Sequence, residues 1–483
     1  MNRWYEKGIF YHIYPLGLLG APKRNEASSV TKGFEELNQW IPHMQSLGCN
    51  AVYIGPLFES STHGYDTRDY RMVDRRLGTN EDFKEFVKQC HEADIKVVVD
   101  GVFNHTGREF FAFKDIQEHR GHSAYKDWYK GVNFDWQSPL GDSFGYEAWQ
   151  GHYELPCLNL WNPDVKQYLF DTVRFWIDTF DIDGIRLDCA NVLDFGFMKE
   201  LRRETESMKE DFWLMGEVIH GEYARWVNDE TLHSVTNYEL HKSLYSAHND
   251  HNYFEIAHSV KRLEAVGPQL YTFVDNHDED RIASKLNDKE HLYPVYTLLF
   301  TLPGIPSIYY GSEWGMEGKR TNTSDEALRP RISIAEQSEH SCSLADYIKK
   351  LGRIHEENIE FQVGRYQELL LTNRQYAFAR FHGEQAVITA VNNDSSDAEV
   401  NIPCPVQGVR PRLRYPPDRR RAADPGHPDR PRRAPQPQCR YRRKPRRPDR
   451  PRPVRPEVHH HRQHRAGEHV AGGIGLVQHL RAE

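Results

Sequence analysis

Short runs of consecutive apolar residues recur along the chain and alternate with segments of helical spacing. Polar residues seldom interrupt these runs, and several of the runs end in a small or acidic residue. Such continuous runs are typical of parallel β-strands that are buried on both faces. The runs lie at residues 9–14, 51–55, 95–100, 184–188, 213–217, 234–237, 271–275 and 307–310.

Apolar residues at helical spacing predict helices between these runs. Thr79 and Asp82 form a capping-box pattern at the start of one predicted helix, whose apolar positions are Phe83, Phe86, Val87 and Cys90. Asn162-Pro163 opens another, whose apolar positions include Leu169, Val173, Trp176 and Phe180. The alternation predicts an α/β fold, a (β/α)₈ TIM barrel. A doubly wound sheet is the alternative, but it would not explain why polar residues recur at so many C-terminal strand ends.

Two segments depart from this alternation. Residues 106–160 are too long for a simple crossover and are rich in Gly and aromatic residues, which predicts a domain inserted after the third strand. Residues 376–381 and 385–391 flank a His-Gly-Glu turn and predict a β-hairpin. We therefore expect a barrel from 1–105 and 161–362, the insert at 106–160, and an incomplete C-terminal antiparallel β-sandwich at 363–409.

Residues 410–483 differ in composition from everything before them. They hold 20 Arg and one Lys against seven acidic residues, a net charge of +14, and 13 of the 27 prolines. Since the whole chain carries −8, residues 1–409 carry −22, which argues against binding to nucleic acid or anionic membranes. RNA binding by the tail, or metal binding by its three consecutive histidines from His459, are alternatives. Because the tail lacks RGG repeats and interleaved aromatics, we expect disorder without function, from a shifted reading frame or altered terminus.

The cysteines and the N-terminus predict a cellular compartment. Seven cysteines are scattered without a CxxC pair, and we expect reduced thiols. The N-terminus shows no signal-peptide core or cleavage site, and no apolar run reaches about 18 residues. The expected protein is cytoplasmic and does not enter the membrane.

Polar residues follow several predicted strands at the point where each strand ends. In a parallel barrel these ends meet at one mouth. Asp188 and Glu217 are 29 residues apart, one β/α unit, and Glu217 and Asp278 are 61 apart, two units. A single acidic residue there is more often a helix cap or ion-pair partner, but burying three carboxylates together is costly without a function. The residues expected at the mouth are Asp100, Asn104, His105, Arg186, Asp188, Glu217, Asn276, His277 and Asp278.

The segments that hold these residues resemble the characteristic regions of the α-amylase family of glycoside hydrolases. They read DGVFNH at 100–105, GIRLDCA at 184–190, LMGEV at 214–218 and VDNHD at 274–278. Further family marks are HGYDTRDY at 63–70, ELPCLN at 154–159 and GIPSIYYGSEWGMEG at 304–318. The resemblance runs from about Trp4 to Asn393. It implies a hydrolase of α-1,4-glucosidic bonds in maltooligosaccharides, cyclodextrins or related α-glucans.

By this resemblance Asp188 is the nucleophile, Glu217 the general acid/base, and Asp278 a residue that hydrogen-bonds the sugar and distorts its ring. Retention through a covalent glycosyl-enzyme intermediate needs one ionised and one protonated carboxyl. We expect Arg186 to hold Asp188 ionised, and crowding by two carboxylates to raise the pKa of Glu217. The implied substrate-binding residues are Tyr65, as a stacking ring, with His105, Arg186 and His277. The insert's aromatic residues would line further subsites or form its core; these are Trp128, Trp136, Phe144, Trp149 and Tyr153.

Three positions depart from the family pattern. Many members bind calcium through an Asn at the position of Asn104 and an Asp where this chain has Cys157. Because calcium prefers oxygen ligands, we predict no calcium there, no other metal and no cofactor. Cys189 lies where the residue correlates with bond preference in related α-glucosidases, and leaves that preference open. Asn191-Val192 is closer to the cyclomaltodextrinases and neopullulanases, whose additional N-terminal domain we do not expect because the first strand begins near Ile9.

Two other functions remain as alternatives. In a transglycosylase another sugar, rather than water, would take the glycosyl group. A non-catalytic sugar-binding member would be expected to lack at least one of the three carboxylates, and all three are present.

Overall fold

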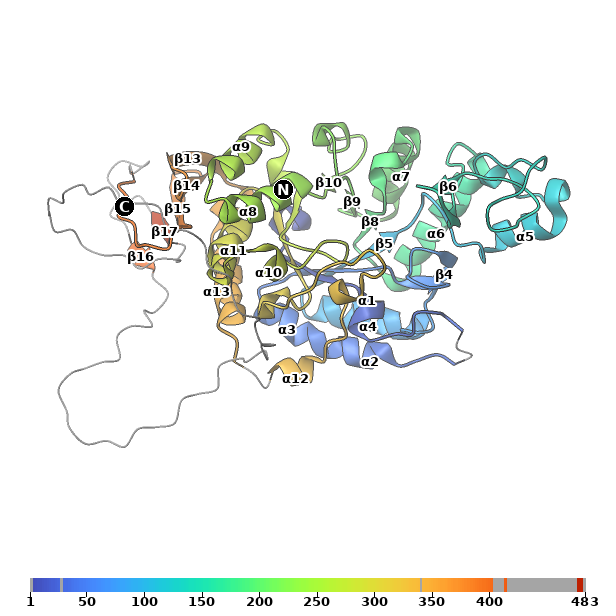
Figure 1. Cartoon of the computed structure of the whole chain (residues 1–483), viewed down its shortest axis with the longest axis horizontal. Coiled ribbons are helices and arrows are strands. Elements are labelled where there is room, and N and C mark those ends of the chain that lie inside the picture. Colours follow the sequence, from blue (N-terminus) through green and yellow to red (C-terminus); the bar gives the residue numbers. More distant parts are fainter. Residues whose placement is uncertain (1–2, 27–28, 339–340, 403–411, 415–475, 481–483) are drawn as a thin grey trace, which may run out of the picture.

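The barrel is the centre of the computed structural model in Figure 1, which describes residues 3–26, 29–338, 341–402, 412–414 and 476–480. Eight parallel strands form one sheet in the order β10-β9-β8-β5-β2-β1-β12-β11. A bridge between Thr236, directly after β10, and Tyr271 of β11 closes the sheet into a barrel. The strands are β1 (Phe10–Ile13), β2 (Ala51–Ile54), β5 (Lys96–Gly101), β8 (Gly184–Leu187), β9 (Trp213–Gly216), β10 (Ser234–Val235), β11 (Tyr271–Phe273) and β12 (Ile305–Tyr309). The eight predicted runs and the predicted barrel are confirmed.

Both faces of the barrel strands are buried, which explains why the runs are continuously apolar. Inside the barrel, the ring centroids of Phe10 and Trp213 lie 4.9 Å apart, and those of Phe10 and Tyr271 lie 5.4 Å apart. The residues next to them, such as Tyr11 and Leu214, belong to the larger core outside the barrel. The barrel interior is therefore a packed core, and polar side chains gather at its mouth.

Both predicted helices form. Helix α4 (Asn80–Glu92) is capped by Thr79, whose Oγ1 accepts from the Asp82 N–H at 3.1 Å. Helix α6 (Pro163–Phe180) is capped by Asn162, whose Oδ1 accepts from the Asp164 N–H at 2.8 Å. The other barrel helices are α1 (Pro15–Leu18), α2 (Gly33–Leu37), α3 (Ile41–Ser46), α7 (Phe195–Met208), α8 (Tyr238–Asn249), α9 (Phe254–Arg262), α10 (Ile282–Lys285), α11 (Leu292–Thr301), α12 (Ile334–Ser338), α13 (Ser343–Glu357) and α14 (Ile359–Val363).

The excursions of the chain lie on either side of the barrel. Within the span predicted as the insert, the structure has α5 (Phe111–His119), β6 (Ala148–Trp149) and β7 (His152–Pro156), at the right of Figure 1. Phe113 lies at the centre of its core, 5.0 Å from the ring of Tyr146 and 5.6 Å from that of Phe144. A separate antiparallel pair, β3 (Phe58–Ser60) and β4 (Thr67–Val73), follows β2.

The C-terminal sheet lies at the left of Figure 1 and has the order β13-β14-β15-β17-β16. The predicted hairpin is confirmed as β14 (Gln375–His382) and β15 (Gln385–Asn392), with β13 (Arg365–Leu371) beside β14. The buried Arg380 guanidinium donates to the carbonyls of Thr301 and Gly364, which fastens the sheet to the barrel. Of the expected incomplete β-sandwich, the described residues form one antiparallel sheet.

Two short strands fall within the basic tail. They are β16 (Arg412–Arg414) and β17 (Leu476–Leu480), and β17 pairs with β15. The expected disorder of the rest of residues 410–483, and the histidines from His459, lie outside the described residues. The five cysteines within the described ranges are unpaired. None of the described helices has the length and apolar character to cross a membrane.

Candidate active site

A pocket of about 1240 Å³ opens between the barrel mouth and the insert. The carboxyls of Asp188, Glu217 and Asp278 all line it. They follow the C-terminal ends of β8, β9 and β11, as predicted for polar residues at the strand ends of a parallel barrel. Other predicted residues on its wall are Tyr65 and His105.

Arg186 joins three of the predicted carboxylates at the base of the pocket. Its Nη1 lies 2.8 Å from Asp188 Oδ1 and 2.9 Å from Asp100 Oδ1, and its Nη2 lies 2.8 Å from Glu217 Oε1. The guanidinium is fully surrounded, with 3% of its side chain exposed. A buried arginine can satisfy its donors in this way only if several acceptors converge on it. One cation therefore fixes Asp188 and Glu217 relative to each other.

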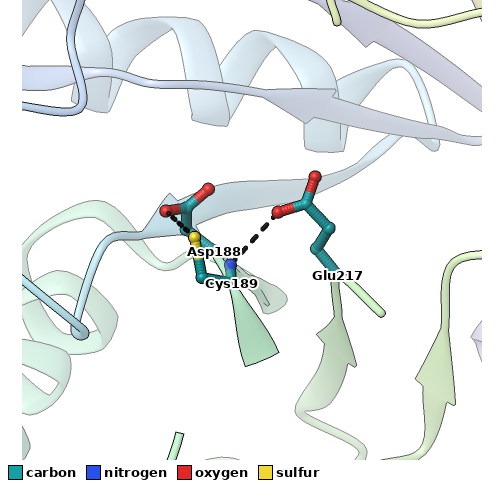
Figure 2. Close-up of side chains that lie close together, drawn as sticks. All are labelled: Asp188, Cys189 and Glu217. Carbon is teal, nitrogen blue, oxygen red and sulfur yellow. Dashed lines mark hydrogen bonds between the residues drawn. The ribbon is translucent and has the colours of Figure 1, made fainter. Parts of the chain in front are cut away.

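Figure 2 shows that Cys189 also connects Asp188 and Glu217. Its Sγ lies 3.1 Å from Asp188 Oδ2, and its backbone N–H donates to Glu217 Oε2 at 3.1 Å. Cys189 adopts a left-handed backbone conformation, with φ of +50°, at the turn that follows β8. One oxygen of each carboxylate and the Cys189 sulfur lie within 4.8 Å of one another. Burial raises the pKa of this thiol, so it keeps its proton and can donate to Asp188.

Glu217 is poised to exchange a proton near neutral pH. Burial raises the pKa of its carboxyl to about 7, with Asp188 and Asp278 adding to the effect and Arg186 opposing it. The expected direction agrees, but burial, rather than the expected crowding by carboxylates, is the largest cause. A carboxyl with such a pKa can act as an acid and then as a base.

Asp278 has the opposite environment. Burial raises the pKa of its carboxyl, but His277, Arg329 and Arg186 outweigh burial and hold it well below the ordinary value. His277 Nε2 lies 3.0 Å from Asp278 Oδ2 and 2.5 Å from the Tyr65 hydroxyl. On the other side, Arg329 Nη2 lies 2.7 Å from Asp278 Oδ1. Asp278 is therefore ionised, and His277 and Tyr65 are aligned beside it.

His105 and the position expected to hold calcium in relatives lie near the insert. Burial lowers the pKa of His105 to about 3, and its buried Nε2 has no hydrogen-bond partner among the described residues. Its Nδ1 lies 3.1 Å from Asn104 Nδ2. Burial raises the pKa of the Cys157 thiol to about 11, so a neutral sulfur stands where calcium would need a carboxylate. A neutral thiol at this position is a poor ligand for calcium.

The aromatic residues of the insert divide into wall and core. Trp149 lines the pocket, with its ring centroid 5.8 Å from that of His105. Trp128 and Phe144 are buried in the core, and Tyr153 packs against it. Trp136 is half exposed and does not line the pocket. Asp66 accepts hydrogen bonds from the N–H and hydroxyl of Thr62 and so stabilises the loop that contains both residues.

Arg329 and Tyr238 also lie at the site, although the sequence did not predict them. Arg329, from the loop after β12, contacts Asp278 and donates to the His277 carbonyl at 3.0 Å. Tyr238 directs its hydroxyl to Glu217 Oε1 at 3.4 Å, and Asn276 donates to it at 3.1 Å. Tyr238 closely follows β10, the sixth barrel strand, so its position at a strand end could have predicted it. Arg329 lies in an irregular loop, and no pattern marks it.

Comparisons with known proteins agree with this geometry. The family model described as "Alpha amylase, catalytic domain" matches residues 35–355. A cyclomaltodextrinase from Thermoanaerobacter pseudethanolicus is 31% identical over 415 residues, which cover 81% of this chain and 71% of that protein. The solved structure of the Nostoc punctiforme debranching enzyme has a TM-score of 0.76 and 28% identity, covering 86% of this chain and 94% of that one. A cyclic α-maltosyl-(1→6)-maltose hydrolase from Arthrobacter globiformis, in its ligand-free form, has a TM-score of 0.72 and 26% identity, covering 82% and 93%.

Proposed function

The chain belongs to the α-amylase family of glycoside hydrolases, and on this premise we propose that it cleaves α-1,4-glucosidic bonds of maltooligosaccharides and cyclodextrins with retention of configuration. The observation that carries the proposal is the spacing of two carboxyls. An oxygen of Asp188 and an oxygen of Glu217 lie within 4.8 Å of each other. Retaining glycosidases place their two carboxyls about 5–5.5 Å apart, whereas inverting ones leave about 6.5–9.5 Å for a water.

Asp188 is proposed as the nucleophile. An Oδ of Asp188 bonds to the anomeric carbon while the glycosidic C–O bond breaks, and the Glu217 carboxyl passes its proton to the departing oxygen. In the second half, the Glu217 carboxylate takes a proton from water, the water oxygen bonds to the anomeric carbon, and Asp188 leaves. The pKa of about 7 for Glu217 suits both steps near neutral pH.

Asp278 and its neighbours are proposed to bind the sugar whose bond is broken. The Asp278 carboxylate can accept from sugar hydroxyls, and the exposed part of the Tyr65 ring can lie against the apolar face of the sugar. His277, 3.0 Å from Asp278, and the unpartnered Nε2 of His105 are placed to contact further hydroxyls. Arg186 orients the nucleophile through its 2.8 Å contact with Asp188.

The proposed substrate class rests on the names of the relatives together with the size of the pocket. A cyclomaltodextrinase and a hydrolase of a cyclic maltosyl-maltose are both similar to this chain. A pocket of about 1240 Å³ has room for more than one sugar ring. We also propose a cytoplasmic location, because the five described cysteines are unpaired, and an active site that works without calcium.

The test is incubation of the purified chain with maltotriose, cyclodextrin, pullulan and starch, followed by chromatography of the products. NMR of the newly released anomer reports retention or inversion. Asp188→Ala is expected to abolish every product, while Asp181→Asn, at the exposed end of α6, leaves activity unchanged. Turnover by Asp188→Ala, or release of the inverted anomer, contradicts the proposal. Products longer than the substrate at high concentration would reveal transglycosylation.

A further inference from the structure

Trp161 is an unusual surface residue. With 78% of its surface exposed, it is the most exposed large apolar side chain within the described ranges. Its ring stacks on no other aromatic ring of the described residues. A tryptophan left this exposed keeps a large apolar surface in water, and a ligand that covers the ring would gain the burial of that surface.

The indole is nevertheless held in place. Its Nε1–H donates to Asp194 Oδ2 at 3.0 Å, and the other Asp194 oxygen caps α7 by accepting from the Phe197 N–H at 2.8 Å. The backbone N–H of Trp161 donates to Asn159 Oδ1 at 3.2 Å, within a turn that closes from the Asn162 N–H to the Asn159 carbonyl at 3.0 Å. The single donor of the ring is thus satisfied, and its apolar faces stay open. A ring fixed beforehand binds a ligand with little loss of entropy.

A short segment of chain joins the residue that holds the indole to the rim of the active-site pocket. Asn191 and Val192 line the pocket, and Asp194 follows Val192 by two residues. The Cα atoms of Val192 and Asp194 are therefore at most about 7.6 Å apart. Val192 is itself 49% exposed, so the rim offers an apolar side chain two residues from the carboxylate that holds the indole.

We propose that Trp161 is a stacking platform for a distal glucosyl unit of an α-glucan whose reacting bond lies between Asp188 and Glu217. This inference rests on the proposed function and adds a binding position to it. A sugar ring offers a flat C–H face to an aromatic ring and hydroxyls to polar groups around it. Polar groups of that kind lie beside Trp161, since the Asp194 carboxylate accepts from its Nε1–H and the Asn159 amide oxygen accepts from its backbone N–H. A protein partner would instead be expected to meet a wider apolar patch.

The platform predicts a dependence on chain length. Trp161→Ala is expected to lower kcat/KM for maltoheptaose about tenfold, equivalent to about 1.4 kcal/mol, and to change that for maltotriose less than about twofold. Trp161→Phe keeps a ring and is expected to retain most of the preference for the longer substrate. Phe254→Ala, which removes a 48% exposed ring at the start of α9, outside the pocket, is the matched control and should leave the ratio unchanged.

A second measurement does not depend on turnover or on the folding of Trp161→Ala. In Asp188→Ala, maltoheptaose should protect tryptophan emission from acrylamide, and Asp188→Ala with Trp161→Phe should show less protection, because only Trp149 on the pocket wall stays covered. An unchanged length ratio in Trp161→Ala, or equal protection in the two proteins, overturns the platform. So does dissociation of an oligomer by Trp161→Ala with the ratio unchanged, since that makes the ring an interface between copies. If the wild type cleaves neither sugar, the proposed function fails instead.

Discussion

Raising the pH above 7 is expected to slow cleavage by removing the proton of Glu217. Burial raises the pKa of this carboxyl to about 7, and Asp188 and Asp278 add to the effect. Compared with the ordinary value of 4.5, this corresponds to about 3 kcal/mol between the protonated and ionised forms. Since only the protonated carboxyl can release the leaving group, kcat/KM is expected to fall about tenfold for each pH unit above about 7.

The same pKa affects stability. Between pH 4.5 and about 7, Glu217 is ionised in the unfolded chain but protonated in the folded one. The free energy of unfolding therefore falls as the pH rises through this window, and this contribution is constant above it. Glu217→Gln cannot ionise, so between pH 4 and pH 8 it should gain stability relative to the wild type by at most about 3 kcal/mol.

The assay is kcat/KM for maltotriose from pH 5 to 9, with urea unfolding of both proteins at pH 4 and 8. Glu279→Gln is the control, because His241 and Lys285 overcome the effect of burial and lower the pKa of Glu279 to about 2. That pKa is far below the pH range in which kcat/KM is predicted to fall. A flat profile between pH 6 and 9 would refute the reasoning. An unchanged alkaline limb in an active Glu217→Gln would refute it as well.

The neighbours of the carboxylates make three more predictions. Cys189→Ala removes the donor 3.1 Å from Asp188 and should lower kcat about threefold to tenfold, about 1 kcal/mol. Cys189→Ser keeps a donor and should restore most of the lost kcat. Equal kcat in the two variants would count against a role for this hydrogen bond. Arg329→Met removes the cation 2.7 Å from Asp278 and should lower kcat/KM about 100-fold. Arg331→Met, which changes an exposed arginine of the same loop, should leave kcat/KM unchanged. Wild-type kcat/KM in Arg329→Met would contradict the prediction. Neither calcium nor EDTA should change the Tm measured by calorimetry, because the neutral thiol of Cys157 replaces the carboxylate that calcium would need. A rise of several degrees in Tm with calcium would reveal a calcium site.

The sequence was sufficient to predict the barrel because burial leaves a direct mark on it. A strand covered on both faces must be apolar throughout, as in Val97–Val98–Val99 of β5. The same logic predicted which residues share the mouth, since Asp188 and Glu217 close neighbouring parallel strands and must emerge at the same end.

The remaining features depend on contacts that no periodicity encodes. Arg329 reaches Asp278 from 51 residues away through an irregular loop, and its position is set by the path of that loop. The left-handed turn at Cys189 likewise has no pattern, because cysteine is not a residue that favours φ of +50°. The dominant role of burial in raising the pKa of Glu217 required the depth of the side chain, which only the folded chain defines.

Glu217 and Asp278, whose pKa values shift in opposite directions, differ in how many cations lie beside them. Glu217 shares the single guanidinium of Arg186 with Asp188 and Asp100, so one positive charge is divided among three acids. Asp278 lies within 3.4 Å of both Arg320 and Arg329 and beside His277. In the first arrangement Arg186 does not overcome the effect of burial, so the pKa of Glu217 stays raised, and in the second the cations overcome burial and keep Asp278 ionised. The division of cations between two sides of one pocket thus provides an acid and an anion from the same chemical group.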